Sequence, residues 1–143
     1  MSVANILGEK GRNVVTMQGS VSLLDVARSL STNKIGAVIV SDDGVSVDGI
    51  VSERDIVNAV AKNGAEVLLR PVAKFMTRNV ITCQDGDAIE NLMEKMTKGR
   101  FRHLPVVNDG KLDGVISIGD VVKMRIAEAQ SVADAMRDYI ATG

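Results

Sequence analysis

Two short junctions of matching pattern hold the residues best suited to ligand chemistry. Gly49–Asp55 and Gly114–Asp120 both read as glycine, two apolar residues, serine, two variable residues and aspartate. A serine followed three residues later by an acid at a helix start is typical of a capping box, in which each side chain bonds the other residue's backbone amide. The same helix start offers free amides and a positive dipole end to a phosphate, and the aspartate offers two oxygens to the paired hydroxyls of a ribose. The residues alone leave both the capping and the ligand interpretation open.

A basic run, Lys98–His103, is the second candidate for ligand binding. Its two arginines, Arg100 and Arg102, precede an apolar stretch, and arginines at the end of a sheet suit bidentate contacts with phosphate. Strand alternation predicts these arginines on one side and the phenylalanine and histidine of the run on the other. The alternative interpretation is a solvated charged edge. The matching stretch of the first half, Asn33–Ala37, is far less basic, so pockets built from the two halves are expected to differ.

These candidates belong to an internal repeat. Shifted by 66 positions, the sequence places Thr16 on Thr82 and the stripe of Leu23–Leu30 on that of Ile89–Met96. Apolar residues in both stripes recur at the i, i+3, i+4, i+7 spacing of a buried helix face. After a hairpin turn, whose length is free to vary, the shift falls to 65 and the two junctions align. A register kept through a helix, two strands and a turn indicates a duplication.

Each copy reads as a strand, a helix, a β-hairpin and a second helix, which is a βαββα unit. In the first copy these elements are expected at Asn13–Thr16, Leu23–Ser31, Gly36–Val40, Val47–Val51 and Glu53–Asn63. The chain then divides into an N-terminal segment (1–12), a first repeat (13–63), a linker (64–76), a second repeat (77–125) and a C-terminal helical extension (126–143). One copy has too little surface to bury a stable core. The expected fold is therefore of the α/β (α+β) class, with two repeats that pack on each other about a pseudo-twofold axis and share a core.

A helical seam continues past the second repeat. Its apolar residues follow one another in alternating steps of four and three, the spacing of a coiled-coil seam: Val122, Ile126, Ala129, Ala133, Met136 and Ile140. We expect a long C-terminal helix that reaches about Tyr139 and pairs with a second copy as a homodimer. The alternative is that it packs back on its own domain, against a short helix expected at Val3–Leu7.

Composition argues against several functional classes. The 143-residue chain has a formal net charge of −1, one tyrosine, two phenylalanines and no tryptophan, which is a poor basis for nucleic-acid binding. Cys83 is the only cysteine and no apolar run is long enough for a membrane span, so a reducing, cytoplasmic location is expected. No phosphate-binding glycine loop, nucleophile triad or metal-ligand cluster stands out. Neither an enzyme nor a metal site is predicted.

The duplicated unit, the strand-end threonines Thr16 and Thr82, the stretch Arg100–Val107 and the two junctions together resemble a tandem pair of CBS domains, a Bateman module. The resemblance runs from about Asn13 to Lys123 and is nearest to stand-alone bacterial CBS-pair proteins, often labelled as related to inosine monophosphate dehydrogenase. The catalytic barrel of that enzyme has no counterpart here. The resemblance implies a regulatory sensor of adenosine-containing ligands, namely AMP, ADP, ATP, NAD(H) or S-adenosylmethionine, acting on an effector protein in trans.

The resemblance also implies two clefts, each joining strand-end residues of one repeat to the Ser-x-x-Asp of the other. The first would gather Thr82, Arg102, His103, Ser52, Arg54 and Asp55, and the second Thr16, Gly36, Ala37, Ser117, Gly119 and Asp120. In the first cleft Asp55 would hold the ribose, while the arginines and the histidine would surround a phosphate. Gly119 replaces Arg54 in the second cleft, so AMP is expected in the first and a weaker or different nucleotide in the second. A dimerisation module with vestigial clefts is the alternative function.

Overall fold

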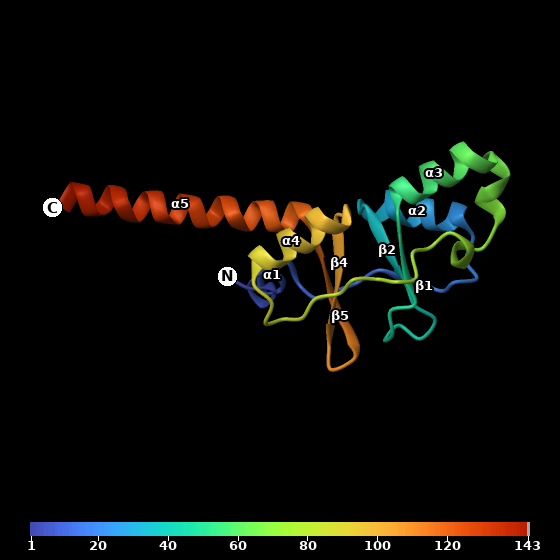
Figure 1. Ribbon diagram of the computed structural model, residues 1–143, viewed down its shortest axis with the longest axis horizontal. Helices are drawn as coiled ribbons and strands as arrows, with labels where there is room; N and C mark the ends of the chain where they lie inside the picture. The colour runs from blue at the N-terminus through green and yellow to red at the C-terminus, as the bar shows by residue number, and fades with distance from the viewer. Residues whose placement is uncertain (143) are drawn as a thin grey trace.

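The computed structural model describes residues 1–142 and shows two small lobes side by side, with one long helix leaving them (Figure 1). The elements follow in the order α1 (Val3–Lys10), β1 (Thr16–Met17), α2 (Leu23–Asn33), β2 (Ala37–Val40), β3 (Gly49–Ser52), α3 (Glu53–Asn63), the 3₁₀ helices η1 (Ala65–Leu69) and η2 (Val72–Lys74), α4 (Ile89–Gly99), β4 (His103–Asn108), β5 (Lys111–Ser117) and α5 (Ile118–Thr142). The predicted mixed α/β class is confirmed. The helices expected at 23–31 and 53–63 are also confirmed, the first running two residues longer.

The first repeat forms a three-stranded sheet in the order β1-β2-β3. β1 runs parallel to β2, and β2 pairs antiparallel with β3 so that Ala37 lies opposite Ser52. Thr77, which follows the linker, adds an antiparallel bridge to Ile50 at the free edge of β3. The linker therefore completes this sheet as well as joining the two repeats.

The second repeat forms a two-stranded sheet of β4 and β5, in which His103 lies opposite Ser117. The strand expected to end at Thr82 is reduced to a single parallel bridge between Cys83 and Val106. The repeat relation nevertheless persists in the backbone. The first amide of α3, on Glu53, donates to the carbonyl of Gly36 at 3.0 Å, and the first amide of α5 donates to the carbonyl of the matching Arg102 at 2.8 Å.

Each lobe has its own hydrophobic core, contrary to the shared core expected from the sequence. The first core combines α2, α3 and the sheet with Val67 and Val72 of the linker. The second combines α4, β4, β5 and the start of α5 with Val3, Ile6 and Leu7 of α1. A βαββα unit is too small to bury a core alone. In each repeat a segment outside the unit completes the core, the linker in the first and α1 in the second. The short helix expected at Val3–Leu7 is confirmed in this role, and it extends to Lys10.

α5 starts in the second repeat and then runs on as a straight arm away from both lobes (Figure 1). It is 25 residues long and ends at Thr142, slightly beyond the expected end at about Tyr139. Its buried residues among those described, Val121 and Met124, both lie in its first two turns. Within the described chain, no helix combines the length and the apolar character needed to cross a bilayer.

Candidate functional site

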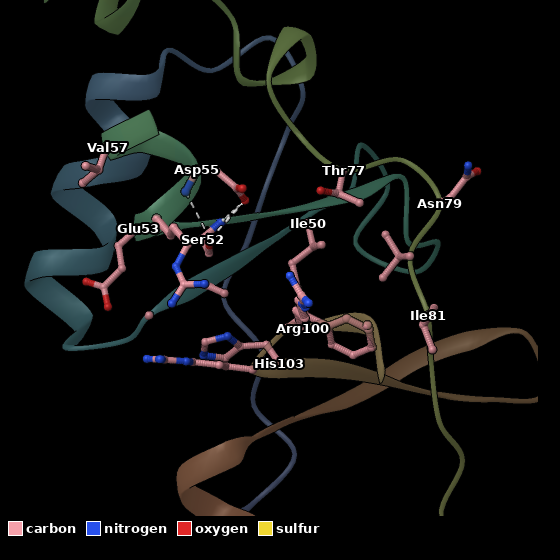
Figure 2. Close-up of a pocket in the computed structure, with 17 residues that line it drawn as sticks. Ile50, Ser52, Glu53, Asp55, Val57, Thr77, Asn79, Ile81, Arg100 and His103 are labelled. Carbon is pink, nitrogen blue, oxygen red and sulfur yellow. Dashed lines mark hydrogen bonds between the residues drawn. The ribbon is translucent and has the colours of Figure 1, made fainter. Parts of the chain in front are cut away.

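A cleft of about 690 Å³ opens between the two lobes, within the range of small-ligand sites. Four segments build its walls: Gly36 and Ala37 at the start of β2, the β3–α3 junction, the chain over 77–81, and residues 99–103 that lead into β4 (Figure 2). Both repeats thus contribute to one site. The first Ser-x-x-Asp junction, Ser52–Asp55, and residues 99–103 of the basic run face the same cleft.

The Ser52–Asp55 capping box is formed at the start of α3. The amide and the hydroxyl of Ser52 donate to Oδ2 of Asp55 at 2.8 and 3.1 Å, and the amide of Asp55 donates to Oγ of Ser52 at 3.3 Å. Both bonds accepted by this carboxylate within residues 1–142 use Oδ2, so Oδ1 is available to a ligand. Because Ser52 and Asp55 also line the cleft, capping and ligand binding are compatible roles for one carboxylate.

The matching box at the start of α5 has an additional partner. The amide of Ser117 donates to Oδ2 of Asp120 at 2.9 Å, as in the first repeat. Nζ of Lys10, at the end of α1, donates to the same oxygen at 2.6 Å and to the carbonyl of Val115 at 2.9 Å. Burial alone raises the pKa of Asp120, but the hydrogen bonds from Lys10 and Ser117 outweigh it and hold that pKa below its usual value. A cation of the chain itself therefore pairs with the carboxylate that the resemblance assigns to a ribose, whereas the Asp55 carboxylate has no ion pair within residues 1–142.

Three arginines, Arg54, Arg100 and Arg102, line the main cleft. None of them has an ion-pair partner within residues 1–142, in contrast to Lys10 and its carboxylate. Two carboxylates, Glu53 and Asp55, also line the cleft, so its charged side chains have an excess of one positive charge. The three guanidinium groups suit a phosphate.

The chain bends sharply where the basic run enters the cleft. Arg100 caps α4 in the left-handed conformation, with φ of 56°, and the strand begins only at His103. All of Arg100, Phe101, Arg102 and His103 line the cleft. The predicted alternation, with two side chains on each side, is wrong because this segment is a helix cap and a bend and not a strand.

His103 of the second repeat lies against Gly36 of the first. A Cβ added to Gly36 would stand 3.2 Å from the imidazole ring, so a larger residue there would require the ring to shift by a few tenths of an ångström. Burial lowers the pKa of His103, the nearby positive charges of Lys10 and Arg102 lower it further, and Asp120 and Glu53 oppose this change. The imidazole is therefore held in its neutral form at neutral pH.

The structure brings most of the first predicted set together. Ser52, Arg54, Asp55, Arg102 and His103 line the cleft. Thr82 is not among the lining residues, and its carbonyl accepts a hydrogen bond from Nζ of Lys95 at 3.0 Å. The cleft is bordered instead by earlier residues of the same segment.

The second predicted set is divided. Gly36 and Ala37 line the main cleft, because Ala37 pairs with Ser52 in the same sheet. The other members, Thr16, Ser117, Gly119 and Asp120, do not line it. Asp120 borders a smaller cavity of about 120 Å³ together with Lys10. Nucleotide binding in a second cleft stays a prediction.

Sequence reasoning missed one wall of the cleft. Thr77, Asn79 and Ile81 line it from the segment after the linker, and Figure 2 shows them along the extended chain. Val80 also lines the cleft from this segment, so its lining residues do not follow the alternation of a strand and no sequence pattern marked this wall. Among the described residues, no group of three or more His, Cys, Asp or Glu side chains could hold a metal ion.

A protein-family model for the CBS domain matches the chain twice, over residues 9–62 and 72–127. The crystal structure of a CBS-domain containing protein from Agrobacterium tumefaciens is 52% identical with a TM-score of 0.85, and the match covers 87% of this chain and 99% of that one. A CBS domain protein from Pyrobaculum aerophilum, complexed with AMP, is 32% identical with a TM-score of 0.75 and coverages of 84% and 89%. The CBS domain pair of protein MJ0100, in complex with 5′-methylthioadenosine and S-adenosyl-L-methionine, is 25% identical with a TM-score of 0.79 and coverages of 90% and 98%.

The chain is also similar to part of longer proteins. It is 31% identical over 121 residues to a CBS domain-containing protein of Arabidopsis thaliana, and the match spans 84% of this chain and 22% of that protein.

Proposed function

Because the chain belongs to the CBS-domain family, as a tandem pair of that domain, we propose that it is a regulatory module that senses an adenine nucleotide, with AMP as its preferred ligand. The single observation that carries this proposal is the cleft in which the Asp55 carboxylate and three arginines without ion-pair partners face one space. Two neighbours of the same fold are complexed with adenosine compounds, one with AMP and one with 5′-methylthioadenosine and S-adenosyl-L-methionine.

The parts of the cleft match the parts of AMP. Oδ1 of Asp55 offers an acceptor to a ribose hydroxyl. The apolar lining offers a slot for a purine ring, and its members are Ile50, Val80, Ile81 and Phe101. The phosphate would lie among Arg54, Arg102 and the helix start of α3. The arginines favour a ligand that carries a phosphate, as AMP does. The alternatives are ATP, ADP and NAD(H), which also carry phosphates, and S-adenosylmethionine, which carries a sulfonium instead.

A dimerisation module with vestigial clefts is the second candidate. It is favoured by the exposed arm of α5 and by the Lys10–Asp120 pair, since only one of the two junction carboxylates is then without an ion pair within residues 1–142. This candidate predicts no effect of nucleotides on stability. A specific ligand at 100 times its Kd would add about 2.7 kcal/mol to the free energy of unfolding.

We propose that the sensor is not an enzyme, because the residues that line the cleft form no nucleophile system. We also propose that it acts as a homodimer on an effector protein in trans. The cytoplasmic location expected from the single cysteine stays a prediction.

Titration calorimetry tests the proposal with AMP, ADP, ATP, NAD and S-adenosylmethionine. The parent is expected to bind AMP most tightly, and the double variant Asp55→Ala/Arg102→Ala is expected to lose binding while keeping its circular dichroism spectrum. The matched control is Asp25→Ala/Arg28→Ala, which removes one acid and one arginine from an exposed pair on α2. Equal AMP affinity in parent and double variant would overturn the assignment of the cleft, and no binding by the parent would favour the dimerisation module.

A further inference from the structure

The outer part of α5 makes no use of its apolar side chains within its own chain. The helix is about 38 Å long, from 25 residues at 1.5 Å each, and Figure 1 shows it leaving the lobes as a free arm. Every described residue from 129 onwards is exposed. Most helices are held by packing of an apolar face and not by intrinsic propensity, and this arm lacks such packing.

The apolar seam lies on the side of α5 that faces away from the second repeat. Met124 is buried against the body, whereas Val122 and Ile126 are 47% and 65% exposed. Each of these two residues is two positions from Met124, and so about 200° around the helix from it. The end of the seam nearest the lobe is therefore exposed to solvent.

We propose that this seam binds the same seam of a second copy in antiparallel orientation, with the two-fold axis at Ser131. The proposal rests on the homodimer proposed above and specifies its surface. Seam residues at equal distances on either side of Ser131 are similar in size. In the antiparallel pair they face each other as Val122 with Ile140, Ile126 with Met136, and Ala129 with Ala133. Large residues meet large ones at both ends and the alanines meet in the middle, where they allow close approach of the helices. In an isologous contact the same surface of both copies meets about a two-fold axis, so that surface must be complementary to itself.

One flank of the seam favours antiparallel over parallel pairing. Val132 and Tyr139 lie together on this flank and are 60% and 78% exposed. In an antiparallel pair like flanks face each other, so the two copies of Val132 meet at the axis. In a parallel pair opposite flanks meet, and Val132 would face Arg137. The antiparallel arrangement therefore covers Val132 with an apolar partner.

The charged residues beside the seam do not add to this preference. In the antiparallel pair each Tyr139 lies near Arg125, whose guanidinium is already paired with Glu90 and Glu128 at 3.0 and 3.3 Å. On the opposite flank Arg137 lies near Lys123 of the second copy, and both side chains are cationic. The preference for the antiparallel orientation therefore comes from the apolar contacts.

The association itself is tested on the full chain by sedimentation equilibrium. The parent is expected to be dimeric, and Ile126→Glu is expected to raise the dissociation constant roughly 100-fold, because each of two symmetric contacts would bury an unpaired carboxylate. The matched control is Ser131→Glu, which adds the same side chain to the same arm on the side away from the seam, and it is expected to stay dimeric. Circular dichroism of both variants checks that the lobes remain folded.

The orientation is tested by disulfide formation between two cysteine variants, with Cys83 replaced by serine. Ile126→Cys and Met136→Cys are prepared with tags of different mass, mixed and oxidised. Antiparallel pairing predicts a mixed disulfide between the two variants and little of either self-disulfide. Self-disulfides without the mixed product would overturn the antiparallel arrangement, and a monomeric parent would overturn the dimer as well. A dimer unaffected by Ile126→Glu would overturn the role of the arm while leaving the homodimer intact, and AMP calorimetry reports on the sensor function separately.

Discussion

Asp55→Asn separates the capping role of this side chain from its proposed role in binding. The substitution keeps the shape of the side chain and one oxygen acceptor. Both bonds that the carboxylate accepts from Ser52, at 2.8 and 3.1 Å, converge on one oxygen, and an asparagine oxygen can take that position. We therefore expect the free energy of unfolding to fall by less than about 1 kcal/mol, which is the weakened interaction with the helix dipole.

The effect on ligand affinity is expected to be much larger. The atom that remains to face the cleft is an NH₂ group, which donates and cannot accept from a ribose hydroxyl. A hydrogen bond to a charged group contributes about 1.5–3 kcal/mol, so the Kd for AMP is expected to rise roughly 10- to 150-fold. Calorimetry gives the Kd, and urea unfolding of the same samples gives the stability.

Asp120→Asn is the matched control, because it changes the same residue in the same type of capping box. Its carboxylate is already bound by Lys10, so we expect a loss of stability with little change in AMP affinity. If Asp55→Asn bound AMP as tightly as the parent, or if both variants weakened binding equally, the assignment of the ribose to Asp55 would be refuted.

Three further predictions follow from the packing around the cleft. Burial and the charge of Lys10 lower the pKa of His103, so the unfolded chain binds a proton at this residue at a higher pH than the folded chain does. The free energy of unfolding is therefore expected to fall as the pH drops from about 6.5. In urea unfolding, His103→Gln is expected to show a smaller fall over the same pH range. Lys10→Met should raise the pKa of Asp120, which the ion pair now lowers; an unchanged carboxyl titration by NMR would contradict the pair. Gly49→Ala should destabilise the protein by about 1–3 kcal/mol, because the new Cβ would stand 2.9 Å from the backbone carbonyl oxygen of Thr77. Gly86→Ala, which meets nothing within 4 Å, should unfold thermally like the parent.

Helix positions were predictable because they depend on neighbours a few residues away. The stripe beginning at Leu23 and the serine cap at Ser52 define α2 and α3 by side-chain spacing and local hydrogen bonds. The duplication was also predictable, because similar residues recur in the same order in both halves. In the structure, the matching residues Gly36 and Arg102 accept matching backbone hydrogen bonds. The short strands were harder to predict. β1 has only two residues and the strand expected before Cys83 is one bridge, because such contacts depend on where a distant strand ends.

The membership of the site was only partly predictable. Asp55 and Arg102 were identified from residue type and from the repeat, and they do face one cleft. Gly36 was placed in the wrong one, because strand pairing within its own repeat decides which side it faces. Thr77 was missed because the linker, and not the βαββα unit, carries it to the edge of β3.

Residue patterns alone specify the caps and the amphipathic arm, through spacings shorter than one helix, and the duplicated unit, through a register kept at a shift of 66 and then 65 positions. Packing between distant segments adds that each lobe keeps its own core and that Lys10 bonds Asp120 across 110 positions of sequence. A salt bridge of that span has no local signature, because it exists only after α1 has packed on the second repeat. The difference between the two carboxylates, one without an ion pair and one paired with a lysine, is therefore a consequence of packing.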